Sequence, residues 1–146
     1  MAPIFKEAST LLERYYSHVK NCGPSYLRGI EKRRALGSFK FSPAPEPDGV
    51  ETVWKIRKFC KDQHEYEGEW SVEKEERHGR GLAFLRWGYF YDGFWKENKM
   101  HGRGRLITSS GSVYVGDFEN DQRHGTGTFT WDSGRRYEGE LKHNLH

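Results

Sequence analysis

Apolar and polar residues alternate with a period of two through the second half of the chain. In the segment YEGEW (66–70), Tyr66, Gly68 and Trp70 would lie on one face of a strand and the two glutamates on the other. The segment 125–131 alternates in the same way, with its threonines opposite its glycines and aromatic residues. This pattern predicts β-strands, and polar stretches such as KENKM (96–100) predict the hairpin turns between them.

The predicted strands recur at a fixed spacing in two kinds of segment. The first kind begins with tyrosine: YEGEW at 66–70, YDGFW at 91–95, YVGDF at 114–118 and YEGEL at 137–141. The second kind begins with His-Gly: HGRG at 78–81, HGRG at 101–104 and HGTG at 124–127. Segments of one kind start 23 residues apart, except for a first step of 25 (91 − 66), because the connection 71–77 is two residues longer than its equivalents. A fixed period of this length is typical of stacked repeats.

Glycine is used regularly inside these strands, although it costs about 0.5–1 kcal/mol there relative to alanine. We expect bare backbone at these positions because large aromatic rings, each burying roughly 150–250 Å², lie on it. We expect each histidine to mark the point where a hairpin enters its second strand. The residues that define the repeat are Gly68, Gly79, Gly81, Gly93, Gly102, Gly104, Gly116, Gly125, Gly127, Gly139, His78, His101 and His124.

The succession of Tyr-x-Gly-x-Trp/Phe and His-Gly-x-Gly resembles the MORN (membrane occupation and recognition nexus) repeat. The resemblance covers residues 66–146, as repeats at 66–90, 91–113 and 114–136 and a partial repeat at 137–146. It implies a mainly β fold, an elongated single-layer antiparallel sheet of consecutive β-hairpin repeats. It also implies a scaffolding role in cytoskeletal, ciliary, junctional or lipid-associated assemblies. Since the partial repeat presents an edge strand, we expect edge-strand pairing or a dimer contact there, unless the chain continues in a longer array.

Residues 1–65 contain no repeat and form a second region, an N-terminal helical appendage with a basic segment and a linker. Apolar residues at helical spacing predict an amphipathic helix from Pro3 to Asn21. The basic stretch Ser25–Gly37 fits a second short helix, and Ser42–Gly49 (SPAPEPDG) fits a linker. Val50–Lys61 fits a strand or a helix, and we favour a strand that leads into the first hairpin.

A single-layer sheet needs a cover for its aromatic face. The N-terminal helix could close its own sheet, or it could dock elsewhere while a partner's helix lies in the groove. We therefore predict a non-enzymatic protein-interaction scaffold, a structural subunit of a larger assembly that binds protein partners across its rings and through its N-terminal segment. The predicted partner-binding residues are Tyr66, Trp70, Tyr91, Trp95, Tyr114, Phe118 and Tyr137.

The sequence motifs that suggest chemistry have structural explanations. Histidines of neighbouring repeats lie two strands apart, about 9.5 Å at ~4.7–4.8 Å per strand, whereas zinc-bound nitrogens sit ~2.0–2.1 Å from the ion. The Gly-x-Gly segments run into strands, whereas a phosphate loop needs a helix N-terminus. Cys22 and Cys60, with His64 nearby, match no disulfide or zinc pattern. We expect no catalytic residue, no metal and no cofactor.

The net charge of +3 is unevenly distributed. Residues 66–146 hold 12 Lys/Arg and 13 Asp/Glu, so the repeats offer no basic groove for nucleic acid. The alternative function is tethering to an anionic phospholipid membrane, where each basic residue near the surface contributes about 1 kcal/mol. The sparse cysteines favour an intracellular, reducing compartment, and the resemblance adds cytoplasmic, ciliary or cytoskeletal settings. The predicted anionic-surface contacts are Arg28, Lys32, Arg33, Arg34 and Lys40.

Overall fold

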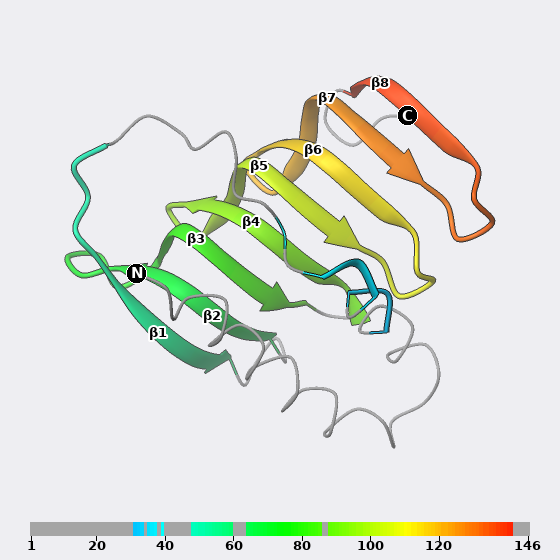
Figure 1. The fold of residues 1–146 in the computed structure, drawn as a ribbon. Coiled ribbons are helices and arrows are strands. Elements are labelled where there is room, and N and C mark those ends of the chain that lie inside the picture. The colour runs from blue at the N-terminus through cyan, green and yellow to red at the C-terminus, as the bar shows by residue number, and fades with distance from the viewer. Residues whose placement is uncertain are drawn as a thin grey trace.

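One open antiparallel sheet runs through the described part of the chain. The computed structural model describes residues 31–33, 35–37, 39, 48–59, 64–85 and 88–141. Its strands are β1 (Thr52–Phe59), β2 (His64–Ser71), β3 (Arg77–Phe84), β4 (Phe90–Lys96), β5 (Lys99–Ile107), β6 (Val113–Glu119), β7 (Gln122–Thr130) and β8 (Arg136–Leu141). They lie in sequence order, each antiparallel to the next (Figure 1). The predicted mainly β sheet of consecutive hairpins is therefore confirmed.

The sheet begins before the first predicted repeat. All eight residues of β1 pair with β2, which confirms the strand favoured within Val50–Lys61. The predicted division between residues 65 and 66 falls inside β2. Residues 31–33 and 35–36 are helical, within the stretch expected to hold a short helix, whereas the predicted helix Pro3–Asn21 and most of the predicted linker lie outside the described residues. In the part of the chain that the structure describes, no helix is long and apolar enough to cross a bilayer.

Two-residue turns close the β4–β5 and β6–β7 hairpins. The side chain of the second residue in each turn accepts a hydrogen bond from the preceding hairpin. Glu97, Asn98, Asn120 and Asp121 all have positive φ, between 49° and 72°, which is the type I′ geometry that matches the twist of the strands. The predicted five-residue turns are thus tighter than expected. The Asn98 side chain accepts from the backbone N–H of Arg77 at 3.2 Å, and Asp121 accepts from the N–H one repeat later, that of Met100, at 2.8 Å.

The His-Gly-x-Gly segments form β-bulges. In the first hairpin Gly68 pairs with Gly81, but the next registered pair is Trp70 with Arg77. The ladder thereby skips one residue of β2 and three of β3. The second hairpin has the same shift, and the third has a shift at the corresponding place. A bulge of this kind bends the strand and frees backbone groups from the ladder.

The two glycines of each His-Gly-x-Gly segment have different tasks. The first glycine adopts a left-handed φ in the bulge, a backbone conformation that residues with a Cβ adopt only with strain. These φ values are 98° at Gly79, 89° at Gly102 and 69° at Gly125. The expectation that every strand glycine lies under a ring therefore needs correction at these three positions. The second glycine does lie under a ring, as the next contacts show.

Each buried tyrosine covers a pair of glycines on neighbouring strands. A Cβ added at Gly93 would lie 2.6 Å from Gly104 Cα and 2.6 Å from Tyr91 Cζ, and one added at Gly104 would also lie 2.6 Å from Tyr91 Cζ. The rings of Tyr66 and Tyr114 meet their glycine pairs in the same way. The ring thus occupies the volume that any larger residue would need.

The rings also connect one repeat to the next. Trp95 makes edge-to-face contacts with Tyr66 and Tyr91, with centroids 5.4 and 5.1 Å apart. Phe118 contacts Tyr91 and Tyr114 in the same manner, at 5.0 and 5.3 Å. Such pairs contribute about 0.5–1.5 kcal/mol beyond their area burial. A continuous row of aromatic rings therefore runs along one face of the sheet.

The opposite face is partly covered by the chain's own N-terminal region. Asp92 Oδ2 lies 2.7 Å from Arg33 Nε and 2.7 Å from an Arg105 guanidinium nitrogen, and Arg105 also donates to the Gly37 carbonyl at 2.6 Å. Phe39 is buried beneath the Arg105 guanidinium, 5.7 Å from the ring centroid. All three charged side chains are buried, and through them Arg33 and Gly37 are held against the sheet. The buried apolar residues of β3, β4 and β5 on this face are Leu82, Phe84, Phe90, Phe94 and Ile107.

The contact between glycine and ring predicts a large cost for a single methyl group. We expect Gly93→Ala to lower the free energy of unfolding by about 3 kcal/mol, because neither the backbone of β5 nor the Tyr91 ring can yield freely. Gly134→Ala is the matched control: its Cβ meets nothing within 4 Å, and only its φ of 98° adds about 1–2 kcal/mol. Urea unfolding of both variants measures the difference, and equal losses would contradict it.

Candidate interaction site

The tyrosine hydroxyls make one repeated hydrogen bond. Each donates to the backbone carbonyl three residues further along its own strand. The distances are 2.6 Å from Tyr66 to Glu69, 2.9 Å from Tyr91 to Phe94, 3.1 Å from Tyr114 to Asp117 and 3.3 Å from Tyr137 to Glu140. In the first two hairpins the accepting residue is the one that the ladder skips at the bulge. The bulge leaves a backbone carbonyl outside the ladder, and the tyrosine hydroxyl donates to it. This hydrogen bond explains why the position holds tyrosine rather than phenylalanine.

Burial keeps these phenols protonated. It raises the pKa of Tyr66 and Tyr91 well above the ordinary value of 10.0, and it raises the pKa of Tyr114 to about 12. Desolvation is the main cause in all three, because the phenolate would lose its hydration inside the ring row. The hydroxyls therefore act as structural donors, and they offer no base or nucleophile for catalysis.

The predicted partner-binding face is mostly interior. The structure brings the first six predicted rings into one core cluster, and none is more than 5% exposed. Tyr137, the seventh, is 41% exposed. Alternation along the strands correctly placed the rings together, but it could not show how fully they bury one another. In this structure only the last repeat presents a tyrosine of the set to a partner.

The three repeat histidines remain separate. His78 is buried, with Nε2 2.5 Å from Asp48 Oδ2 and with Nδ1 accepting from the Glu97 N–H at 3.4 Å. The hydrogen bond from His78 is the main reason why the pKa of Asp48 is lowered. Burial lowers the pKa of His101. Among the described residues no group of three or more His, Cys, Asp or Glu is arranged to hold a metal ion.

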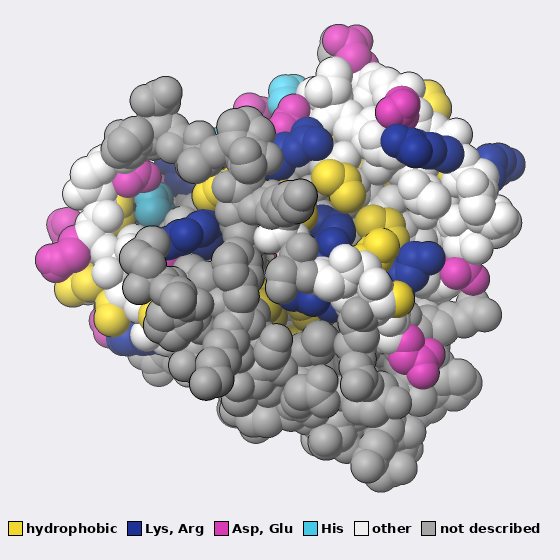
Figure 2. All heavy atoms as spheres, in the orientation of Figure 1, with side chains coloured by type: hydrophobic (Ala, Val, Ile, Leu, Met, Phe, Trp, Pro, Cys, Tyr) yellow, Lys and Arg dark blue, Asp and Glu magenta, His cyan; other side chains and the backbone are white. Residues whose placement is uncertain are grey.

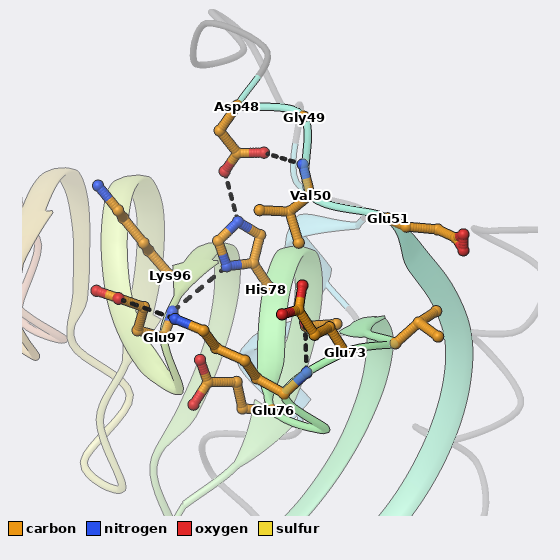
Figure 3. A pocket seen from close by; sticks show the side chains of 12 residues that line it. Asp48, Gly49, Val50, Glu51, Glu73, Glu76, His78, Lys96 and Glu97 are labelled. Atoms are coloured by element: carbon orange, nitrogen blue, oxygen red, sulfur yellow. Dashed lines mark hydrogen bonds and ion pairs between the residues drawn. The ribbon is translucent and has the colours of Figure 1, made fainter.

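His78 lines a pocket of about 440 Å³ beside the β2–β3 turn. The pocket lies between the segment before β1, the long β2–β3 turn and the β4–β5 turn (Figure 3). Figure 2 shows acidic side chains and a histidine at this end of the molecule. Val50 and Val72 expose apolar surface beside the pocket's charges. Its charged lining is Asp48, Glu51, Glu73, Glu76 and Glu97 against Lys74 and Lys96.

Sequence reasoning missed this pocket for a definite reason. Asp48 was assigned to a linker, and nothing in the local sequence pairs it with a histidine 30 residues away. The available signal was the longer connection 71–77, the one place where the repeat spacing changes. The two extra residues lengthen the β2–β3 turn, which forms one wall of this pocket. The shorter turns of the other repeats lack these residues.

The predicted anionic-surface contacts do not form one exposed patch in the described residues. Arg33 is buried against Asp92, so it is not available to a membrane surface. Burial, the largest influence, lowers the pKa of Arg33, while Asp92 opposes that shift. Lys32 is partly exposed, whereas Arg28, Arg34 and Lys40 lie outside the described residues.

The hydroxyl bond predicts unequal effects of one chemical change at two equivalent sites. Tyr91→Phe removes a donor from a buried carbonyl, and we expect it to lower the free energy of unfolding by about 1–3 kcal/mol. Tyr137→Phe removes the same hydroxyl where water can replace it, and we expect a loss below about 0.5 kcal/mol. Equal losses in urea unfolding would show that the hydroxyl bond does not stabilise the bulge.

The raised pKa values also predict sensitivity to alkali. Above about pH 10 tyrosines of the unfolded chain ionise while those of the fold stay protonated, so the unfolded state binds fewer protons and stability falls as pH rises. For Tyr114 the loss spans pH 10.0 to about 12, and below pH 10.0 it contributes no pH dependence. Urea unfolding across this range should show a shallower decline for Tyr114→Phe than for the wild type; identical slopes would refute the assignment.

Comparisons with known proteins agree with this geometry. A family model of the MORN repeat matches residues 91–113 and 114–135. Each match starts at the tyrosine that covers a glycine pair and contains a complete bulged hairpin. A search of curated proteins found no match to the chain. MORN repeats are a non-enzymatic module that commonly mediates protein or membrane interactions. The spacing, the bulges and the matched segments together identify residues 91–113 and 114–135 as MORN repeats.

Proposed function

We propose that the protein is a non-enzymatic scaffold that binds protein partners within a larger assembly. The observation that carries the proposal is the ring row, which runs unbroken across β2 to β7 and uses the repeat's tyrosines, tryptophans and glycines for packing. Such a sheet is a rigid support whose binding features lie outside the ring row. We place it in an intracellular, reducing compartment on the cysteine pattern, and in a cytoskeletal or ciliary setting by analogy with the family.

The pocket lined by His78, beside the β2–β3 turn, is the partner site that we propose. It combines apolar surface from Val50 and Val72 with an excess of carboxylates. Charge complementarity favours a partner segment that places a lysine or arginine beside an apolar side chain. The Asp48 carboxylate and the Glu97 backbone N–H both contact His78, and these contacts connect the pocket's walls.

Membrane tethering is the weaker alternative. The buried pair of Arg33 with Asp92 removes the central residue of the predicted basic cluster. Among the predicted anionic-surface contacts, Lys32 is described by the structure and is partly exposed. We therefore assign partner binding to the pocket. Binding to lipid vesicles tests the alternative of membrane tethering.

Quantitative capture of partners by the full chain tests this proposal. We expect Glu73→Lys to reduce retention of a defined set of proteins about fivefold, because it reverses a charge at the pocket rim. Glu119→Lys, the same change at an exposed position beside the β6–β7 turn, should leave that set within about twofold. Equal retention by both variants would contradict a pocket-dependent scaffold. Flotation with phosphatidylserine vesicles that is lost in Lys32→Glu would instead support membrane tethering.

A further inference from the structure

The face opposite the ring row carries a site that holds an arginine side chain. Asp92 of β4 pairs in register with Arg105 of β5, and its carboxylate lies 2.7 Å from the Arg105 guanidinium. The sheet itself therefore fixes this carboxylate. Arg33 donates to the same oxygen from Nε at 2.7 Å, and its guanidinium lies over the Phe90 ring, 5.4 Å from the centroid. A carboxylate beside an aromatic ring is a combination that recognises a guanidinium.

Arg105 contacts two further groups of the segment that contains Arg33. Its Nη2 donates to the Gly37 carbonyl at 2.6 Å, and its guanidinium lies over the Phe39 ring, 5.7 Å from the centroid. The Gly37 N–H donates to the Arg33 carbonyl at 2.9 Å and closes a helical turn, and its left-handed φ of 79° favours glycine there. The bound segment thus has arginine, then glycine four residues later, then phenylalanine two residues after the glycine.

These contacts have the form of peptide recognition, although the bound segment belongs to the same chain. They join residues that are 59 and 68 positions apart in the sequence. Each is made by a side chain or a carbonyl, so an equivalent segment of another protein can make it. Asp92 is 1% exposed and Arg105 is 7% exposed. Buried charges of this kind are selective, because a bound segment without the arginine would leave Asp92 with one charged partner fewer.

The chain's own segment satisfies this site incompletely. Two guanidiniums share one carboxylate, so the buried group carries an excess positive charge. Among the described residues, the buried Nε of Arg105 has no hydrogen-bond partner. Burial lowers the pKa of Arg33, because its charged form loses hydration. A tethered segment tolerates such costs, since its effective concentration is on the order of millimolar. A partner segment with additional contacts can therefore replace it.

We propose that this site binds a segment of a partner protein with the pattern arginine, glycine four residues later and an aromatic residue two positions after the glycine. In the described structure Arg33, Gly37 and Phe39 occupy the site in cis, and the partner displaces them. The partner's arginine then pairs with Asp92, and its glycine carbonyl accepts from Arg105. The inference rests on the proposed scaffold function and deepens it, because it names a class of partner whose binding requires release of the chain's own segment.

A peptide copied from residues 31–39 provides the probe. Its sequence, EKRRALGSF, holds the pattern, and the matched control peptide has glutamine at the position of Arg33 but keeps the neighbouring arginine. The receptor is the full chain with Arg33→Ala and Phe39→Ala, in which Asp92 still has Arg105 as its partner. We expect saturable binding of the first peptide and about tenfold weaker binding of the control, because glutamine brings no charged donor. Fluorescence anisotropy of labelled peptide measures both affinities.

A second receptor guards against damage to the fold. Arg33→Ala alone is a smaller change, and we expect it to rank the two peptides in the same order. Circular dichroism compares the secondary structure of both receptors with that of the wild type.

The wild-type chain and two further variants test the competition. The wild type should bind the peptide about tenfold more weakly than the double variant, because its own segment occupies the site. Asp92→Asn, added to the receptor, should weaken binding about tenfold. Asp117→Asn, the same change at a half-exposed carboxylate on β6, should leave affinity within about twofold. Amide NMR should show peptide-induced shifts in β4 and β5.

Four results would overturn the proposal: no saturable binding at millimolar peptide, equal affinity for the glutamine peptide, equal affinity for the wild type, or amide shifts that spare β4 and β5. The capture experiment at the pocket changes Glu73, which lies in the β2–β3 turn. Failure of the peptide with success of the capture would therefore remove this site and leave the scaffold function standing. The opposite pair of results would move the partner site from the pocket to this face.

Discussion

A tyrosine ring lying on two glycines is the contact on which the rest of the sheet depends. The ring needs bare backbone on two neighbouring strands, because a Cβ on either would occupy the volume of the ring. Its hydroxyl, once buried, needs an acceptor, and the bulge supplies a carbonyl outside the ladder. The bulge in turn requires a residue with left-handed φ, which is the first glycine of His-Gly-x-Gly. The two sequence segments of the repeat are therefore two halves of one packing unit that spans a hairpin.

Two further contacts turn these units into a continuous sheet. Trp95 and Phe118 each lie between tyrosines of successive repeats, so burial in one repeat depends on its neighbour. The side chains of Asn98 and Asp121 fix each turn to the hairpin before it. Nearest-neighbour coupling of this kind is characteristic of repeat proteins, and it places the unmatched surfaces at the two ends of the array.

Two parts of the sheet differ in chemistry. Beside the β2–β3 and β4–β5 turns, extra turn residues and the Asp48–His78 contact build an acidic pocket with an apolar rim. In β8, Tyr137 is exposed, whereas the equivalent tyrosines of the earlier repeats are buried. The second face is partly covered by Arg33, which pairs with Asp92, and by Gly37, whose carbonyl accepts from Arg105.

The sequence alone determined the strand periodicity, the order of the hairpins and the pairing of rings with glycines, because these depend on local alternation and on a repeat that can be counted. It also identified β1 as a strand, although the apolar spacing in Val50–Lys61 also fitted a helix. Other features depended on contacts between distant residues: the full burial of six rings, the division of labour between the two glycines of each His-Gly-x-Gly segment, and the pairing of Arg33 with Asp92. Only the tertiary structure decided these features, because burial and strand register depend on residues that are neighbours in space. The sequence pattern predicts the face of the sheet on which a side chain lies. It does not predict what packs against that side chain.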